Sequence, residues 1–363
     1  MAINPFRFET RKTTLNLDDE NHIKELDPKN MLAHIDELPT QLQSAWKYVM
    51  GLTLPPKIEL SNIVILGMGG SAIGGSLLQT LLAKECPVPI VSNRNYQLPT
   101  FVGADTLVIA SSYSGETEET LAALTDAHNL GAQIVSISTG GKIAKLTEEY
   151  GGVAWRFKYD SQPRAALGYS LLLPLGLLVR METVRDFSQD VEETIQVLRE
   201  EQNSLTTTSP IISNPAKRMA EKMFDHMVLL ISADPLTPVA RRWRGQIAEN
   251  SKAWAQFEHL PEMNHNAIAG LGYPEALIDQ TFVLFLESAH CHPRNRHRAE
   301  LTRNLFTKKG YNTASVHGLG ESRLAQMLSV LHYGDYVSLY LAIAYGVDPS
   351  PVKPISWLKE QLA

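Results

Sequence analysis

A hydroxyl-rich loop between an apolar run and a polar helix is the first feature of the sequence that could bind a ligand. Leu107–Ala110 is a short apolar run typical of a buried strand. Ser111–Gly115 follows as a loop of small residues, and Thr117 is expected to cap the next helix. A strand that ends in such a turn at a helix N-terminus offers backbone N–H groups and hydroxyls to a dianion. The pattern therefore predicts a phosphate site that includes Ser112, Ser114 and Thr117.

A glycine-rich loop, Gly67–Gly75, follows the predicted strand Ile63–Leu66. Its spacing is similar to that of a dinucleotide-binding loop, and Arg94 after the next strand keeps an NADP site open as an alternative. Two features favour phosphate instead: the hydroxyl of Ser71 stands at the turn, and no acidic residue ends the second strand. We therefore expect Gly70 and Ser71 to complete the phosphate site from a neighbouring strand.

Several segments in combination resemble the bifunctional phosphoglucose/phosphomannose isomerases, which consist of sugar isomerase (SIS) domains. The matching segments are GGSA at 69–72, SYSGETEET at 112–120, Arg244–Lys252, Pro261–Asn266 and Gly346–Val352. The resemblance covers residues 28–363. It implies two α/β domains and an aldose–ketose isomerase that acts on a hexose 6-phosphate without a cofactor or a metal.

The resemblance assigns the catalytic base to Glu249, within a helix predicted at Val239–Phe257. A single Glu on a helix is more often a solvated surface residue, but several other polar residues crowd the same two turns. A carboxylate whose pKa is raised by partial burial suits removal of a proton beside a carbonyl. The apolar stripe of this helix is predicted to comprise Trp243, Ile247 and Trp254.

Arg164, before the apolar helix that ends near Arg180, is assigned by the resemblance to the enediolate intermediate. A fixed positive charge is appropriate where negative charge develops during a reaction. Without the resemblance, an Arg at this position would equally well pair with an acidic residue or lie at the surface.

The ring-opening acid/base implied by the resemblance is His265, whose neighbours Asn264 and Asn266 are expected to fix its tautomer. In the family this His can come from the neighbouring subunit, which implies a homodimer with a shared active site. The family also has a functional lysine near the C-terminus. By its distance from the end of the chain, Lys359 fits that role better than Lys353.

These assignments predict interconversion of glucose 6-phosphate and mannose 6-phosphate with fructose 6-phosphate through a cis-enediol. Ser350 stands where relatives often have Thr, and its small side chain is compatible with room for both C2 epimers. A non-catalytic SIS regulator that binds sugar phosphates is the alternative, although no basic recognition helix is evident. An amidotransferring isomerase is disfavoured because Met1 and Ala2 provide no N-terminal nucleophilic Cys.

The elements that must position these residues alternate regularly between strand and helix. From Asn62 to Phe157, and again from Met227 to Tyr345, the alternation predicts a doubly wound parallel sheet with helices on both faces. Ligands of such sheets bind at the carboxyl ends of the strands, where both loops fall. The expected parts are a helical lead-in at 1–60 packed on the first domain, SIS domains at 61–204 and 205–363, and a linker at Thr206–Pro215.

Composition excludes several kinds of partner. The 363 residues are 44% hydrophobic and 20% charged, and the net charge of -6 favours neither nucleic acid nor a membrane surface. The apolar run between Arg164 and Arg180 contains Pro174 and is too short to span a bilayer. With no secretory signal and two cysteines outside any CxxC pair, we expect a cytoplasmic protein.

A cluster of potential metal ligands lies late in the chain. It comprises His290, Cys291, His292 and His297. Pro293 and the neighbouring arginines favour a loop that leads into a helix, and the proposed isomerisation needs no metal.

Overall fold

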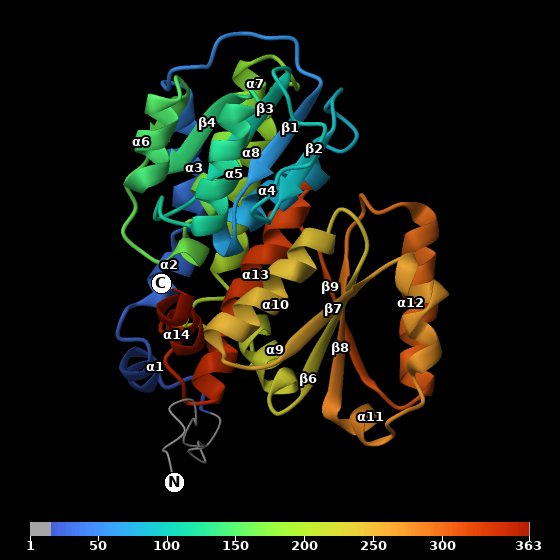
Figure 1. Ribbon diagram of the computed structural model, residues 1–363. Helices are drawn as coiled ribbons and strands as arrows, with labels where there is room; N and C mark the ends of the chain where they lie inside the picture. The colour runs from blue at the N-terminus through green and yellow to red at the C-terminus, as the bar shows by residue number, and fades with distance from the viewer. Residues whose placement is uncertain (1–15, 363) are drawn as a thin grey trace. The chain divides into compact units, whose positions relative to one another are not determined.

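The computed structural model describes residues 16–362, which pack as two compact units (Figure 1). The first-sheet unit comprises Glu37–Leu198 and Gly320–Gln326. The second-sheet unit comprises residues 16–36, Arg199–Leu319 and residues 327–362. The units therefore divide after Asp36 and within the helices that contain Leu198 and Gln326. The domain boundaries predicted from the sequence were after residues 60 and 204.

The first-sheet unit contains a five-stranded parallel sheet with the order β2-β1-β3-β4-β5. Its strands are β1 (Asn62–Leu66), β2 (Ile90–Asn93), β3 (Thr106–Ser111), β4 (Gln133–Ser138) and β5 (Val153–Arg156). Its helices are α3 (Leu38–Val49), α4 (Gly69–Leu81), α5 (Glu118–Asn129), α6 (Gly141–Glu149), the 3₁₀ helix η1 (Pro163–Ala165), α7 (Leu167–Arg180) and most of α8 (Ser188–Gln202).

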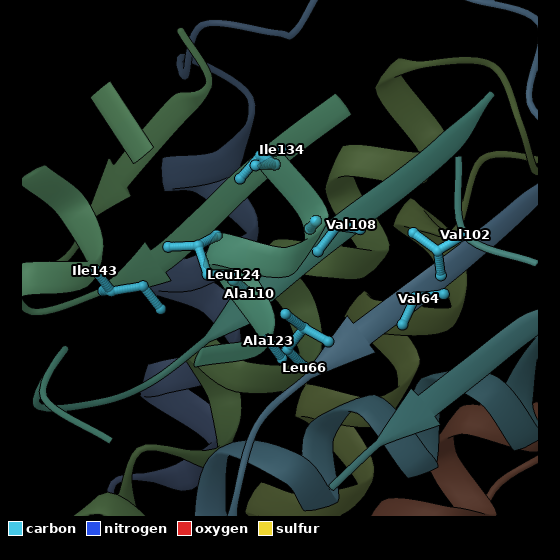
Figure 2. Packing of buried hydrophobic residues seen from close by; sticks show 10 residues of the cluster. Val64, Leu66, Val102, Val108, Ala110, Ala123, Leu124, Ile134 and Ile143 are labelled. Carbon is cyan, nitrogen blue, oxygen red and sulfur yellow. The ribbon is translucent and has the colours of Figure 1, made fainter. Parts of the chain in front are cut away.

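Alternate residues of the inner strands face two different helical layers. Val64 of β1 and Val108 of β3 pack with Leu124 of α5 in one hydrophobic cluster (Figure 2). Ile65 faces the opposite layer and packs against Gly75 of α4. A Cβ added to that glycine would lie 2.8 Å from Cγ2 of Ile65. All residues of β1 and β3 are buried, as expected for parallel strands that helices cover on both faces.

The second-sheet unit contains a four-stranded parallel sheet with the order β7-β6-β8-β9. Its strands are β6 (Met227–Ser232), β7 (Ala255–His259), β8 (Thr281–Glu287) and β9 (Asn312–His317). Its helices are α1 (Glu20–Leu26), α2 (Met31–Asp36), α9 (Pro215–Met223), α10 (Thr237–Asn250), η2 (Glu262–His265), η3 (Ala267–Gly270), α11 (Ala276–Gln280), α12 (Pro293–Lys308), most of α13 (Arg323–Ala344) and α14 (Lys353–Leu362).

Helix α10 is fixed to α13 by one very close contact and one buried ion pair. The Trp243 ring lies against Gly334, where a Cβ would come 2.0 Å from Cε2 of the indole. The indole Nε1 donates to the carbonyl of Val330 at 2.9 Å. The guanidinium of Arg242 binds both carboxylate oxygens of Asp335, at 3.2 and 2.7 Å, and both side chains are almost fully buried. Since breaking a buried pair is costly, these contacts fix the position of α10.

The predicted helix Val239–Phe257 was wrong at its C-terminal end. Helix α10 stops at Asn250, and β7 follows as the strand next to β6. Lys252 adopts a left-handed backbone with φ of 57°, which ends the helix. Trp254 lies outside the helix and is 72% exposed, so the predicted apolar stripe keeps only Trp243 and Ile247.

The predicted linker Thr206–Pro215 is a packed part of the second-sheet unit. Asn214 is fully buried; its Oδ1 accepts from two N–H groups at the start of α9, and its Nδ2 donates to the carbonyl of Thr206 at 3.0 Å. Lys217 donates from Nζ to the carbonyl of Thr207 at 2.9 Å. The polar composition of this segment therefore serves helix capping rather than a flexible connection.

No helix among residues 16–362 is long and apolar enough to cross a bilayer. The apolar run before Arg180 forms α7, which contains Pro174 and is buried along most of its length.

Candidate active site

The two predicted phosphate loops lie at the switch point of the first sheet. β1 is hydrogen-bonded to β2 on one side and to β3 on the other. From β1 the chain continues to β2, whereas from β3 it continues in the opposite direction to β4 and β5. Ligands of open α/β sheets bind in the crevice at such a reversal of strand order. The loops after β1 and β3 are therefore neighbours at the carboxyl edge of the sheet.

The loop after β3 is held in shape by its own hydroxyl groups. Ser112 is buried, and its Oγ lies 2.9 Å from Oγ1 of Thr117 and accepts from the N–H of Gly115 at 3.1 Å. Ser114 is exposed, and its Oγ accepts from the N–H of Glu116 at 3.2 Å. The Ser114 hydroxyl therefore keeps its own proton to donate to a ligand, and of the paired Ser112 and Thr117 hydroxyls one keeps its proton.

Thr117 does not cap α5 through its side chain, contrary to the sequence prediction. It occupies the N-cap position, but its hydroxyl is paired with Ser112 instead. The N–H groups of the first turn of α5 are thus left for another acceptor, because a helix does not satisfy them internally.

The loop after β1 joins this arrangement through Ser71. Its Oγ accepts from the backbone N–H of Tyr113 at 3.1 Å, and the side chain is buried. Helix α4 begins at Gly69 without a side-chain cap, so its first-turn N–H groups belong to the small residues Gly69 and Gly70. An uncapped helix N-terminus without side-chain bulk is suited to bind an anion.

Arg164 lies directly beside the start of α4. A Cβ on Gly70 would lie 2.7 Å from the carbonyl oxygen of Pro163 and 2.8 Å from the backbone nitrogen of Arg164. Only glycine permits this approach, and the Arg164 side chain is itself buried, with 4% exposed. The structure therefore brings Arg164 close to the predicted phosphate loops, although Ser71 lies 93 residues earlier in the chain.

Glu249 occupies the last turn of α10, where it is half-buried and is followed by the buried polar residues Asn250 and Ser251. Asn250 donates from Nδ2 to Oγ of Ser338 in α13 at 3.0 Å, and the Oγ of Ser251 donates to the carbonyl of Ser338 at 2.6 Å. The turn that carries Glu249 is thus attached to α13 by side chains on its C-terminal side.

Lys252 connects this turn to the segment that contains Ser350. Its Nζ donates to the carbonyl of Glu249 and, at 3.1 Å, to the carbonyl of Pro349. Ser350 is buried next to Pro349. Lys252 therefore links the end of the Glu249 helix to the segment that contains Ser350, a link that the sequence did not reveal.

His265 is exposed at the end of η2, and its neighbours do not hold its ring. Asn264 donates from Nδ2 to Oγ1 of Thr302 at 2.9 Å. Asn266 donates from Nδ2 to Oε1 of Glu262 at 2.8 Å, and its Oδ1 accepts from the N–H of Ala267. The expectation that these two amides fix the tautomer of His265 is wrong, because both bond elsewhere.

Lys359 lies exposed in the last turn of α14, and Lys353 lies exposed at its first residue. The structure thus joins the predicted site residues in the first-sheet unit but places Glu249, His265 and Lys359 on three separate elements of the second-sheet unit. Two contributors were not predicted, Tyr113 and Lys252. The bonds of Tyr113 to Tyr159 and Ser161, and that of Lys252 to Pro349, join distant parts of the chain and leave no local signal in the sequence.

Among residues 16–362, no group of three or more His, Cys, Asp or Glu side chains is arranged to hold a metal ion. His292 instead caps α12 by accepting from the N–H of Arg294 at 3.1 Å, and His297 lies near Glu300 on the same helix.

A family model described as the bacterial phospho-glucose isomerase C-terminal SIS domain matches residues 212–362. The chain is also 40% identical over 335 residues to a bifunctional phosphoglucose/phosphomannose isomerase of Caldicellulosiruptor bescii, covering 92% of this chain and 99% of that protein. The chain belongs to the bifunctional phosphoglucose/phosphomannose isomerase family. The resemblance seen in the sequence and the predicted enzyme class, an isomerase, are confirmed.

A second relative and a solved structure are also similar to this chain. The isomerase of Aquifex aeolicus with the same name is 34% identical over 303 residues, 83% of this chain and 90% of that protein. The crystal structure of hypothetical protein TT0462 from Thermus thermophilus has a TM-score of 0.71 at 16% identity, covering 94% of this chain and 93% of that one. This likeness confirms the predicted α/β fold class with its parallel sheets.

Gly70→Ala tests the contact between α4 and the Arg164 segment. The added Cβ must displace backbone at Pro163 or Arg164, so we expect affinity for glucitol 6-phosphate to fall about tenfold or more. Isothermal titration calorimetry measures this affinity, and the matched control is Gly103→Ala, whose nearest atom would be a side-chain oxygen at 3.7 Å. Unchanged affinity in the Gly70 variant would show that the close contact does not shape the phosphate site.

Proposed function

We propose that this chain interconverts glucose 6-phosphate and mannose 6-phosphate with fructose 6-phosphate by proton transfer through a cis-enediol. The observation that carries the proposal is the pairing of hydroxyl-rich loops at the first switch point with a buried arginine beside them. Family membership supports the same reaction, because the relatives named above are phosphoglucose/phosphomannose isomerases.

The phosphate group is the part of the substrate that the first-sheet unit binds. Ser71 and Ser114 supply hydroxyl donors, the paired hydroxyls of Ser112 and Thr117 supply one more, and Gly70 supplies a helix N-terminal N–H. A dianion held at a helix N-terminus is favoured by the helix dipole as well as by these donors. Fixing one end of the sugar provides the binding energy that orients the reacting carbons at the other end.

The isomerisation moves one proton between neighbouring carbons. After His265, with Lys359, has opened the sugar ring, Glu249 removes the proton from C2 of the aldose. The electrons of that C–H bond form the C1–C2 double bond, and the carbonyl oxygen takes up negative charge that Arg164 stabilises. Within the enediol a proton passes from the C2 hydroxyl to the C1 oxygen. The protonated carboxyl group then returns the C2 proton to C1 as the C2 carbonyl forms, which gives the ketose. No metal ion takes part in this scheme.

Mannose and glucose 6-phosphates differ only in configuration at C2, so one base must reach the proton of either epimer. Rotation about the C2–C3 bond permits this where the site has room. Ser350 has a small side chain and lies next to Pro349, which Lys252 ties to the Glu249 turn. This arrangement supports Ser350 as a neighbour of the reacting carbons. The alternative of a non-catalytic regulator is not favoured, since the relatives are named as enzymes.

We propose further that the active enzyme is a cytoplasmic homodimer with a shared active site. Helix α14 exposes the apolar side chains of Ile355, Trp357 and Leu358, which a second copy would remove from water. His265 lies on an exposed 3₁₀ helix, where it is accessible to a neighbouring subunit. Both cysteines, Cys86 and Cys291, are free, which is compatible with a reducing compartment.

Glu249→Gln tests the base assignment, since the amide keeps the shape of the side chain but cannot accept the C2 proton. We expect kcat to fall about a thousandfold with both aldose phosphates while glucitol 6-phosphate still binds. A coupled assay gives kcat, and Glu300→Gln on the exposed face of α12 is the matched control. Parent-like turnover by the Glu249 variant would refute its role as the base.

Mixing two inactive variants tests the shared site. If His265 serves the neighbouring subunit, a heterodimer of Glu249→Gln and His265→Ala contains one intact site and one doubly defective site. Random 1:1 assembly should then restore about one quarter of the parent activity. Sedimentation confirms the dimer, and a mixture of Glu249→Gln with itself is the control. A dimeric mixture that stays inactive would place His265 and Glu249 of one subunit in the same site.

A further inference from the structure

The phosphate loop contains one large side chain that the proposed mechanism does not use. Tyr113 stands between Ser112 and Ser114, and its ring is half-buried. Its backbone belongs to the phosphate loop, because its N–H donates to Oγ of Ser71 at 3.1 Å. Its carbonyl accepts from the N–H and the hydroxyl of Thr139, at 3.0 and 2.8 Å. The backbone of Tyr113 is therefore fixed on both sides within the carboxyl edge of the first sheet.

The hydroxyl of Tyr113 is bonded to a different segment of the same unit. The hydroxyl donates to two carbonyl oxygens, that of Tyr159 at 2.5 Å and that of Ser161 at 2.9 Å. It also accepts from the N–H of Ser161 at 2.9 Å. The ring packs edge-on against Phe157, with centroids 6.2 Å apart. The Tyr113 hydroxyl thus holds the segment that follows β5 both as a hydrogen-bond donor and as an acceptor.

That segment leads directly to Arg164, three residues after Ser161. Its other end is held by Gln41 of α3, whose Nε2 donates to the carbonyl of Ala165 at 2.9 Å and to the hydroxyl of Tyr159 at 2.7 Å. The Tyr159 hydroxyl in turn donates to Glu37 at 3.0 Å. Burial raises the pKa of Tyr159, so this hydroxyl keeps its proton. The chain on either side of Arg164 is therefore anchored at two points.

We propose that Tyr113 is a positioning residue that sets the placement of Arg164 relative to the phosphate loop. Its backbone is part of the loop that binds the phosphate, and its hydroxyl holds the segment that carries the arginine. The close contact at Gly70 keeps the two backbones together, and Tyr113 adds a second connection from the opposite loop. This inference rests on the proposed role of Arg164 at the enediolate.

The two connections of Tyr113 have separable consequences. Removing the hydroxyl leaves the N–H that bonds to Ser71, so the phosphate site keeps its shape. It releases the segment at Tyr159 and Ser161, which lets Arg164 shift. Misplacement of a catalytic group by about 1 Å can lower a rate by about a hundredfold, whereas ground-state binding of the phosphate is largely unaffected.

Tyr113→Phe is the test. We expect kcat with fructose 6-phosphate to fall about tenfold to a hundredfold, while KM and the affinity for glucitol 6-phosphate change less than about twofold. The matched control is Tyr150→Phe, which removes a hydroxyl that lies 3.3 Å from Oγ1 of Thr125 in the same unit. Thermal unfolding of both variants accompanies the kinetics, so that a loss of folded protein is recognised.

A double-mutant cycle with Arg164→Gln separates this inference from the proposed function. If Tyr113 acts through Arg164, adding Tyr113→Phe to Arg164→Gln lowers kcat little further. Full activity of Arg164→Gln alone would refute the role of the arginine. A large loss in Arg164→Gln combined with parent-like kcat in Tyr113→Phe would overturn the positioning role and leave the proposed function intact.

Two other outcomes also overturn the inference. A rise in KM without a fall in kcat would show that Tyr113 serves only phosphate binding, and fully additive losses would show that it acts independently of Arg164. Should Tyr113→Phe fail to fold, Gln41→Met releases the same segment from its other anchor, and a fall in kcat at constant KM is again expected. A parent-like kcat in that variant would contradict the account.

Discussion

The close approach of two backbones at Gly70 is the constraint on which the first-sheet unit depends. The start of α4 and the 3₁₀ helix η1 lie so near each other that a single added carbon would come within 2.7 Å of a carbonyl oxygen. This contact places the backbone of Arg164 against the loop that follows β1, the first strand of the unit. The hydrogen bonds of Ser71, Tyr113 and Gln41 are arranged around it. A phosphate at the helix N-terminus would therefore lie beside the backbone of Arg164, whose side chain is buried.

In the second-sheet unit, the corresponding constraint is the fixed position of the helix that carries Glu249. Helix α10 is fixed along its length by the Arg242–Asp335 pair and by the Trp243 ring on Gly334. Removing either partner of this buried ion pair would leave an uncompensated charge, so the pair restricts where α10 can lie. Lys252 then closes the helix by binding the carbonyl of Glu249 itself. The predicted base is thus presented on a turn whose backbone is bonded on several sides.

The features of the fold and the site that could be predicted from the sequence are those set by residues close together in the chain. The apolar run before Ser111 and the hydroxyls after it are adjacent in the chain, so the strand, the loop and the following helix were predicted together. The helix that carries Glu249 was extended into β7, because nothing in the local pattern shows that Lys252 adopts a left-handed backbone. Tyr113 was overlooked for another reason, since its hydroxyl bonds to residues 46 and 48 positions away. Thr206–Pro215 has the composition of a linker but serves to cap a helix.

In the proposed mechanism, Glu249 carries a proton between C2 and C1 of the substrate. Its most direct test is nuclear magnetic resonance of fructose 6-phosphate equilibrated with the enzyme in deuterium oxide over many turnovers. We expect solvent deuterium to accumulate at C2 of the glucose and mannose 6-phosphates formed, and Glu249→Gln not to catalyse this exchange. Complete retention of the original hydrogen during turnover by the parent enzyme would indicate direct hydride transfer between the carbons and would refute proton transfer by Glu249.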